Sequence, residues 1–401
     1  MAAEVVHCPH ADDCGGCDFI GRPLSWQRDH KISELGSLLR AGGVSFPAID
    51  FISPALNGLR DRLDFVLEEG RLGLAGKSRR EAGENPPGPA FGAGLAAPKE
   101  RPDFSGGTGS RIVDLLECGQ LSASLGAWLE EFRAHLPRVR RGSVRLRVAP
   151  DGRRGMWLDF SNADIKNLLD ESAWLKSWPA DVVIEMGQRR KWVDRGPSRP
   201  VLRDPVLFPW FESRFQEEVV PLYGMVGSFT QPGLRSNRLI TEWIQSEVRR
   251  RNPRHIVEFG SGQGNLSFPA LSGGATLTAC ETDRLALQGF ARSLEALAEK
   301  GHDLRAKVRI EAGDFLRRPP EDFLSADLLL VNPPRSGLKK FLDPLPQARG
   351  LESILSMSCH PESFAEDAPR MVREGFALKK LRILDQFPQT KHYEVLAVFE
   401  R

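Results

Sequence analysis

The six cysteines of this chain fall into settings that suit different chemistry. Cys8, Cys14 and Cys17 lie together near the amino terminus, and Cys118 follows far along the chain. Clustered thiols with a distant partner indicate a metal or iron–sulfur site, since four thiolates bind either zinc or a [4Fe-4S] cluster. The amino terminus does not resemble a signal peptide, so we expect a cytoplasmic protein whose thiols serve as ligands or catalysts.

Cys359, in the segment SMSCHP, stands apart as a candidate nucleophile, and Glu394 in KHYEV is its candidate base. We expect Cys359 at the carboxyl end of a strand, over the ligand-binding edge of a sheet. Basic neighbours and a following helix start would lower its pKa from about 8.5. A single cysteine is more often a small buried hydrophobe, which is how we interpret Cys280. Glu394 by itself also fits a surface strand position.

A glycine-rich turn provides a second constellation. The apolar segment HIVEF runs directly into GSGQGN. Glycines after a strand let the backbone approach a ligand at a helix start, and the same pattern fits a dinucleotide site. The residues that we assign to cofactor binding at this turn are Glu258, Gly260, Gly262 and Gly264.

Polar residues also end the strands expected after this turn. Glu281 is placed to hold ribose hydroxyls, and Asp314 to reach an adenine edge. Asn332, stiffened by the prolines that follow it, is placed to face the reacting group. Acidic side chains at these strand ends suit S-adenosylmethionine, a cationic ligand without phosphate. The alternatives are a helix cap at Asp314 and an ordinary Asn-Pro-Pro turn.

The elements that must position these residues change in kind along the chain. Apolar residues recur at helical spacing over 236–250. After this helix, short apolar strands alternate with helices, which predicts a doubly wound parallel sheet. The expected strands are HIVEF, ATLTAC, VRIEA, DLLLVN, SILSMS, ALKKLRIL and VLAVF.

The earlier part of the chain has a different pattern. A helix over 24–41 and a hairpin over 59–75, with Glu69-Gly70 as its turn, indicate an α+β, antiparallel arrangement. Residues 81–109 are rich in glycine and proline and predict a flexible insertion. We therefore expect two domains, at 1–225 and 226–401.

Composition and charge argue against a membrane protein and indicate a polyanionic partner. The chain is 41% hydrophobic and 27% charged, as in soluble globular proteins. No apolar run approaches the roughly 18 residues of a membrane span. Seven arginines lie between Arg138 and Arg154, in and before a hairpin over 143–160, and a second basic run covers 187–203, with Trp157 and Trp192 interleaved. Such stretches suit RNA phosphates and unstacked bases, although each alone also fits a solvated strand face.

The order of short motifs resembles the uracil-5 RNA methyltransferases, the family of TrmA, RlmC and RlmD. The matching motifs are FTQ at 229–231, GSGQGN, NPPRSG, SCHP and FPQTKHYEV. The resemblance covers nearly the whole chain except 81–109. CxxxxxCxxC with Cys118 resembles the [4Fe-4S] site of the ribosomal-RNA members, and no TRAM domain precedes Cys8. NPPR and HYEV are most similar to the RlmC type, whereas FTQP is closer to the tRNA enzymes.

The resemblance implies an α/β, Rossmann-like S-adenosylmethionine-dependent methyltransferase domain, preceded by an α+β iron–sulfur and RNA-binding domain. Cys359 would add to carbon-6 of uracil, and Glu394 would remove the carbon-5 proton. Gln231 and Asn332 would contact the cofactor and the target base. We expect a monomeric enzyme that acts on RNA, with 23S ribosomal RNA favoured. The alternatives are a tRNA methyltransferase or a non-catalytic RNA-binding protein, and zinc in place of the cluster held by Cys8, Cys14, Cys17 and Cys118.

Overall fold

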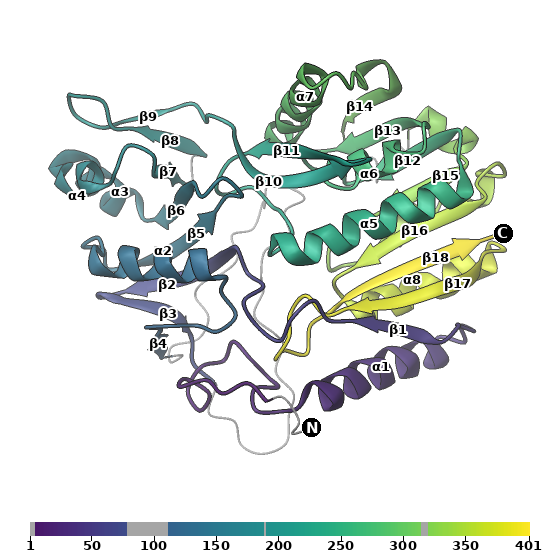
Figure 1. Ribbon diagram of the computed structural model, residues 1–401, viewed down its shortest axis with the longest axis horizontal. Helices are drawn as coiled ribbons and strands as arrows, with labels where there is room; N and C mark the ends of the chain where they lie inside the picture. Colours follow the sequence, from purple (N-terminus) through teal and green to yellow (C-terminus); the bar gives the residue numbers. More distant parts are fainter. Residues whose placement is uncertain (1–4, 78–110, 188–189, 314–319) are drawn as a thin grey trace.

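The computed structural model describes residues 5–77, 111–187, 190–313 and 320–401. The expected insertion at 81–109 lies outside these ranges. In the described part of the chain, the strands form two eight-stranded sheets and a two-stranded ribbon. Figure 1 shows the two sheets on opposite sides of the molecule, each with its own helices, and the ribbon between them.

One sheet carries all the strands expected after residue 226, which confirms the α/β, Rossmann-like fold class. In sheet order its strands are β1 (Ile49–Ile52), β17 (Ala377–Leu384), β18 (Glu394–Glu400), β16 (Ser353–Ser358), β15 (Leu328–Val331), β12 (His255–Phe259), β13 (Thr276–Glu281) and β14 (Val308–Ala312). The sheet is parallel except at β18, which runs antiparallel to both of its neighbours. The connection from β17 to β18 contains no crossover helix, and a direct return of this kind pairs strands antiparallel.

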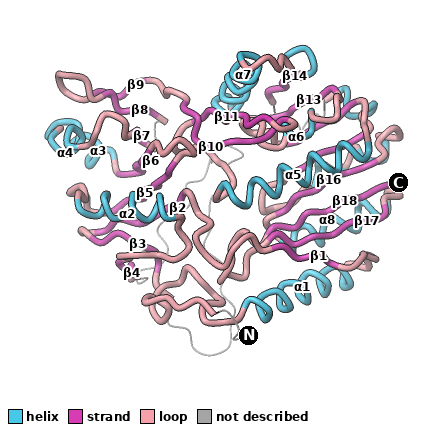
Figure 2. Tube along the Cα trace, viewed as in Figure 1, coloured by secondary structure: helices cyan, strands magenta, loops and turns pink. Residues whose placement is uncertain are grey.

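Helices cover both faces of this sheet, and successive strand residues alternate between the two cores. Leu328 and Leu330 face one core, whereas Leu329 and Val331 face the other. A parallel sheet buried on both faces needs such continuously apolar strands. Figure 2 shows the helices on either side of the strands. The elements on one face are α5 (Leu234–Arg251), α6 (Ser267–Leu271) and α7 (Arg284–Glu299), and those on the other are α1 (Leu24–Ala41), α8 (Pro361–Arg373) and the short 3₁₀ helices η2 (Glu321–Ser325), η3 (Lys339–Leu342) and η4 (Leu345–Gln347).

The amino-terminal part of the chain contributes to this sheet. Strand β1 pairs in parallel with β17, from Ile49 opposite Leu381 to Ile52 opposite Leu384. Helix α1 packs in the same core as α8. The division into domains at residue 225 therefore remains a proposal. In the structure, an amino-terminal strand and helix also belong to the sheet formed by the residues after 226.

The second sheet carries its own helices and core. Its strands, in sheet order, are β4 (Ile112–Asp114), β3 (Arg71–Ala75), β2 (Arg62–Glu68), β5 (Arg141–Val148), β6 (Arg154–Phe160), β7 (Val183–Met186), β8 (Lys191–Asp194) and β9 (Val201–Arg203). Helices α2 (Ala123–Ala134), α3 (Asn162–Glu171) and α4 (Ala173–Ser177) pack into its core. The expected hairpin is confirmed, with its turn at Glu69 and Gly70 in positive φ. The ribbon β10 (Phe208–Phe215) and β11 (Glu218–Gly224) packs instead into the α5–α7 core.

The arginine-rich hairpin β5–β6 has fewer free cations than the sequence predicts. Val144, Leu146 and Val148 are buried as expected. On the other face, Arg145 donates to Asp64 and to the Gly227 carbonyl. Arg147 is buried and donates to the Met225 and Val226 carbonyls. The expected basic RNA face is therefore wrong for these two arginines, because both face partners inside the protein.

Candidate functional site

Strand pairing brings Cys359 and Glu394 to one edge of the parallel sheet. Strands β16 and β18 pair antiparallel, with Ser358 opposite Val395 as the last pair toward this edge. Cys359 follows Ser358, and Glu394 precedes Val395, so the next step of the same register sets the two side by side. Residues 35 positions apart in the sequence thus share the carboxyl edge where ligands bind in such sheets.

Burial and charge act in opposite directions on the Cys359 thiol. Burial, followed by the nearby Glu394 carboxylate, raises the pKa of Cys359 to about 12. The Arg335 guanidinium opposes this shift by its positive charge and by donating a hydrogen bond to the sulfur. The predicted lowering of the thiol pKa is therefore wrong for the protein without ligands, because desolvation outweighs the basic neighbour.

Glu394 is a buried carboxyl group with one short hydrogen bond. Its side chain is 2% exposed, and the Gln386 amide Nε2 donates to its Oε2 at 2.6 Å. Burial raises the pKa of Glu394 to about 8, while this hydrogen bond and the Arg335 charge act against the shift. A buried carboxyl group with a pKa near the operating pH has the properties of a general base.

Gln386 also connects Glu394 to Gln231. The same Nε2 donates to the Gln231 Oε1 at 3.2 Å. Neither Gln386 nor Arg335 has a role predicted from the sequence, although Arg335 lies inside NPPRSG and Gln386 directly precedes FPQTKHYEV. The available signal was their position, because each lies in the loop that follows a strand at the edge that carries Cys359.

The glycine turn after β12 has the tight geometry expected of it. Gly264 has a φ of +90°, and a Cβ there would lie 2.6 Å from the Phe290 ring. Only glycine satisfies both requirements. Glu258 is fully enclosed just before the turn and accepts a hydrogen bond from the Ser267 hydroxyl at 2.5 Å. Burial raises its pKa to about 8. Gly260 and Gly262 share positive φ with Gly264.

Glu281, at the end of β13, closes the same turn. Its carboxylate accepts hydrogen bonds from the backbone N–H groups of Gly262, Thr282 and Asp283. Asn332 directly follows β15 at the same edge and is half-buried. Asp314, predicted from the sequence to reach an adenine edge, lies outside the described residues.

The loop that carries Gln231 is held from the second sheet. The Arg147 side chain is 1% exposed and donates to the Thr230 hydroxyl at 3.0 Å. Arg62 donates to the Thr230 carbonyl at 2.6 Å. Glu185 accepts hydrogen bonds from the N–H groups of Val226 and Gly227. The second sheet therefore fixes one wall of the site.

The connection between β17 and β18 is clamped by the amino-terminal segment. Lys31 donates to Asp385 at 2.8 Å, and both side chains are fully buried. Gln27 and Gln389 exchange hydrogen bonds, from the Gln27 amide to the Gln389 side chain and from the Gln389 backbone N–H to Gln27. The Phe19 N–H donates to the Gln389 carbonyl at 2.8 Å. Helix α1 thus positions the segment that leads into Glu394.

The thiols of Cys8, Cys14, Cys17 and Cys118 lie close enough to influence one another. Burial, followed by the neighbouring thiols of Cys118, Cys14 and Cys8, raises the pKa of Cys17 to about 12. Within the described ranges, no group of three or more His, Cys, Asp or Glu side chains is arranged to hold a metal ion. Nearby Arg60 lies 4.9 Å from the Phe387 ring centroid, which links the thiols to the connection before Glu394.

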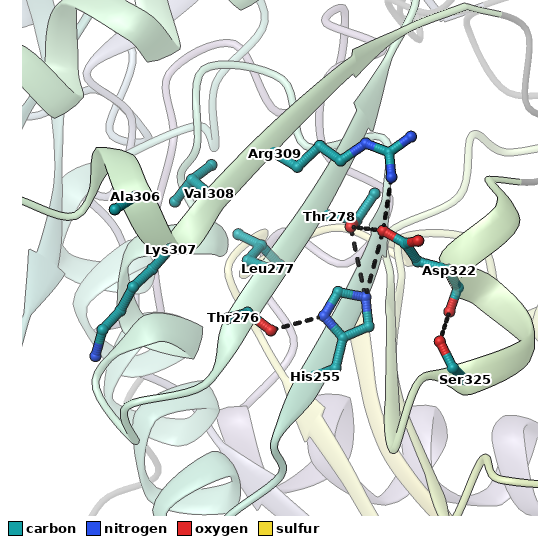
Figure 3. A pocket seen from close by; sticks show the side chains of 10 residues that line it. All are labelled: His255, Thr276, Leu277, Thr278, Ala306, Lys307, Val308, Arg309, Asp322 and Ser325. Carbon is teal, nitrogen blue, oxygen red and sulfur yellow. Dashed lines mark hydrogen bonds and ion pairs between the residues drawn. The ribbon is translucent and has the colours of Figure 1, made fainter.

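A cavity of about 340 Å³ lies away from this site, among β12, β13 and β14. Figure 3 shows Asp322 within it, accepting hydrogen bonds from Thr278 and Arg309. His255, also in its lining, is the first residue of β12. The cavity therefore opens toward the amino ends of the strands, opposite the edge that carries Cys359.

Comparison with known proteins agrees with this arrangement. A family model described as tRNA (uracil-5-)-methyltransferase matches residues 217–401. The chain is 42% identical to an uncharacterised RNA methyltransferase of Bdellovibrio bacteriovorus, over 99% of this chain and 95% of that protein. It is 31% identical to the 23S rRNA (uracil(1939)-C(5))-methyltransferase RlmD of Acidithiobacillus ferrooxidans, over 98% of this chain and 83% of that protein.

A solved structure shares the fold of nearly the whole chain. The tRNA (uracil-54, C5)-methyltransferase of Pyrococcus abyssi, in complex with S-adenosyl-L-homocysteine, has a TM-score of 0.65 and 17% identity, covering 96% of this chain and 86% of that one. Among the described residues, no helix is long and apolar enough to cross a membrane.

Proposed function

This chain belongs to the RNA uracil-5 methyltransferase family, and we propose that it methylates carbon-5 of a specific uridine in 23S ribosomal RNA. The observation that carries this proposal is the position of Cys359 and Glu394, each one residue beyond the last β16–β18 pair, with the Glu394 charge acting on the Cys359 thiol. A thiol and a buried carboxyl group at a ligand-binding edge are the two groups that the reaction requires.

The chemistry assigned to these residues begins with the thiolate. Carbon-5 of uracil is a poor nucleophile, so the Cys359 sulfur first bonds to carbon-6 and pushes the ring electrons toward the carbon-4 oxygen. S-adenosylmethionine, when bound, supplies the methyl group that the electron-rich carbon-5 accepts. Glu394 then takes the proton from carbon-5, the ring double bond re-forms, and the carbon–sulfur bond breaks to return the thiolate.

Neighbouring residues supply orientation and charge in this proposal. Arg335 favours the thiolate form of Cys359 by its hydrogen bond and positive charge. The glycine turn, with Glu258 and Glu281, would hold the methyl donor at the carboxyl ends of β12 and β13. Asn332 and Gln231 would contact the donor and the target base.

The proposed RNA class rests on the relatives. The 23S rRNA enzyme of Acidithiobacillus ferrooxidans aligns with nearly the whole chain at 31% identity. The tRNA enzyme of Pyrococcus abyssi shares the fold at 17% identity. A tRNA substrate is therefore the second candidate.

We also propose that Cys8, Cys14, Cys17 and Cys118 hold a [4Fe-4S] cluster, with zinc as the alternative. The donor set fits both, because four thiolates suit either centre. The mutual influence of the thiols on the pKa of Cys17 supports their proximity. The centre would hold the amino-terminal segment beside the second sheet, and no step of the methylation passes through it.

A methylation assay on defined transcripts tests the proposal. Purified protein is incubated with radiolabelled S-adenosylmethionine and either 23S rRNA or tRNA, and 5-methyluridine is measured in each. We expect product in 23S rRNA, none with Cys359→Ala, and full activity with Cys280→Ala, which removes a buried thiol elsewhere in the sheet. Product in tRNA alone would overturn the proposed substrate, and its absence from both RNAs would overturn the activity.

A further inference from the structure

The Gln386 side chain makes two donations from one nitrogen at the centre of the site. It is 1% exposed, and its Nε2 reaches the Glu394 Oε2 at 2.6 Å and the Gln231 Oε1 at 3.2 Å. Its own Oε1 is buried and has no hydrogen-bond partner among the described residues. Because Gln386 donates twice and leaves its own acceptor oxygen unpaired, its orientation is set by the two acceptors, Glu394 and Gln231.

Glu394 dictates this orientation. An ionised carboxylate only accepts hydrogen bonds, so the Gln386 NH₂ group must face it. The reverse orientation would set the Gln386 carbonyl oxygen against the carboxylate, with both groups buried and neither able to donate. The orientation of Gln386 therefore matches the ionised form of Glu394, which is the form that can take the carbon-5 proton.

The orientation passes on to Gln231. Because Gln386 offers a proton, Gln231 must present its Oε1 on that side. The Gln231 Nε2 is then the atom directed to the other side, where the proposed target base would lie. An amide NH₂ group is a donor only, and it therefore recognises an acceptor on the base.

A donor at this position would distinguish uracil from cytosine. At carbon-4, uracil carries a carbonyl oxygen, which accepts, whereas cytosine carries an amino group, which donates. Building on the proposed function, we infer that Gln386 is a positioning residue. It orients the Gln231 amide as a donor, so that the site binds uracil in preference to cytosine. It acts through Gln231 and Glu394 and need not touch the base.

The connection between β17 and β18 holds Gln386 in place. Its neighbour Asp385 is fixed by the buried pair with Lys31 and by its backbone N–H, which donates to the Ile52 carbonyl. Gln389, in the same connection, is equally buried but bonds to Gln27 and to the Leu56 carbonyl instead. Gln389 is therefore a matched control with the same burial and no contact with Gln231 or Glu394 in the hydrogen bonds of the described residues.

The test measures covalent capture of two RNAs that differ at one base. A 23S rRNA fragment methylated by the wild type is made with 5-fluorouridine or 5-fluorocytidine at the target position, and the rate of adduct formation is measured for each. The wild type should capture the uridine RNA with strong preference. Gln386→Leu should reduce that preference roughly 10- to 100-fold, which is about the discrimination that one specific side-chain contact with a base provides.

Two further variants keep the result specific. Gln386→Glu retains the shape but accepts where the amide donated, so Gln231 should turn and the preference should shift further toward cytidine RNA. Gln389→Leu should lower thermal stability but leave the preference at the wild-type value. The pH midpoint of turnover should rise in Gln386→Leu, because the hydrogen bond that favours ionised Glu394 is lost, and should stay unchanged in Gln389→Leu.

The outcomes separate this inference from the proposed function. A wild-type protein that captures neither RNA overturns both. A wild type selective for uridine RNA, with folded Gln386→Leu and Gln386→Glu variants of unchanged preference, overturns the positioning role alone. If Gln386→Leu does not fold, the isosteric Gln386→Glu variant decides the question.

Discussion

At the scale of single residues, the site combines two acids that are hard to ionise. Burial raises the pKa of Cys359 to about 12 and that of Glu394 to about 8. Each group raises the cost of charging the other, since two adjacent negative charges repel. Arg335 is the nearby positive charge that offsets this cost for both. A cationic ligand beside them would favour the ionised forms further.

The proton-accepting role of Glu394 predicts a pH dependence. Only the ionised carboxylate can take the carbon-5 proton, and its pKa of about 8 means that the ionised fraction grows as pH rises toward that value. Breakdown of the methylated Cys359 adduct to 5-methyluridine, the step that needs Glu394 and no free thiolate, should therefore speed up about tenfold per pH unit below 8 and level off above it. Rapid-quench measurements across this range check the slope. Activity that falls or stays flat as pH rises would contradict the assignment.

At the scale of elements, the connection between β17 and β18 depends on a contact that no local pattern reveals. Lys31 on α1 and Asp385 after β17 form a fully buried ion pair. Removing one partner of such a pair leaves an uncompensated charge in the interior. The pair fixes the segment that carries Gln386 and leads into Glu394.

Lys31→Ala should lower the free energy of unfolding by about 3–5 kcal/mol. Arg382→Ala breaks the exposed pair with Asp50 on the neighbouring strands β17 and β1 and should change it by less than about 1 kcal/mol. The double variant Lys31→Met with Asp385→Asn, which removes both charges, should recover much of the loss. Urea unfolding measures all three. Equal effects of Lys31→Ala and Arg382→Ala would show that the buried pair has no special role.

Local pattern predicted the strands after residue 226 because each is a short apolar run before a polar strand end. It did not predict β1 on the same sheet, since a four-residue strand that pairs with residues Leu381–Leu384 depends on long-range contacts. The inward direction of Arg147 was missed for a related reason. Charged residues are usually exposed, and only the fold brings carbonyl groups to surround this one.

At the scale of the whole molecule, the proposed cluster would join the amino-terminal segment to the second sheet. Protein purified without oxygen should contain iron and sulfide and show visible absorbance, and Cys118→Ser should lose both. Cys280→Ser, a buried thiol elsewhere, should retain them. Thermal unfolding of the Cys118→Ser variant should begin at lower temperature, because metal binding contributes to folding. A colourless protein with bound zinc would favour the alternative centre.

The whole molecule brings both sheets to one site. The second sheet holds the Gln231 loop through Arg62 and Arg147, and helix α1 holds the segment before Glu394. The catalytic assignment therefore draws on residues from the first to the last strand, which explains why the family resemblance spans nearly the entire chain. Cys359 is the group on which the whole account depends.

The most direct measurement is covalent capture of RNA by Cys359. A base can remove hydrogen from carbon-5 as a proton but cannot remove fluorine in the same way. With 5-fluorouridine in the target RNA, the reaction should therefore stop after methyl transfer. Intact-mass spectrometry should then find protein, RNA and one methyl group in a single species, with the linkage mapped to Cys359. Cys359→Ala should give none, and Glu394→Gln should accumulate the adduct even with unmodified RNA. Turnover without any adduct, or an adduct on another residue, would contradict the account.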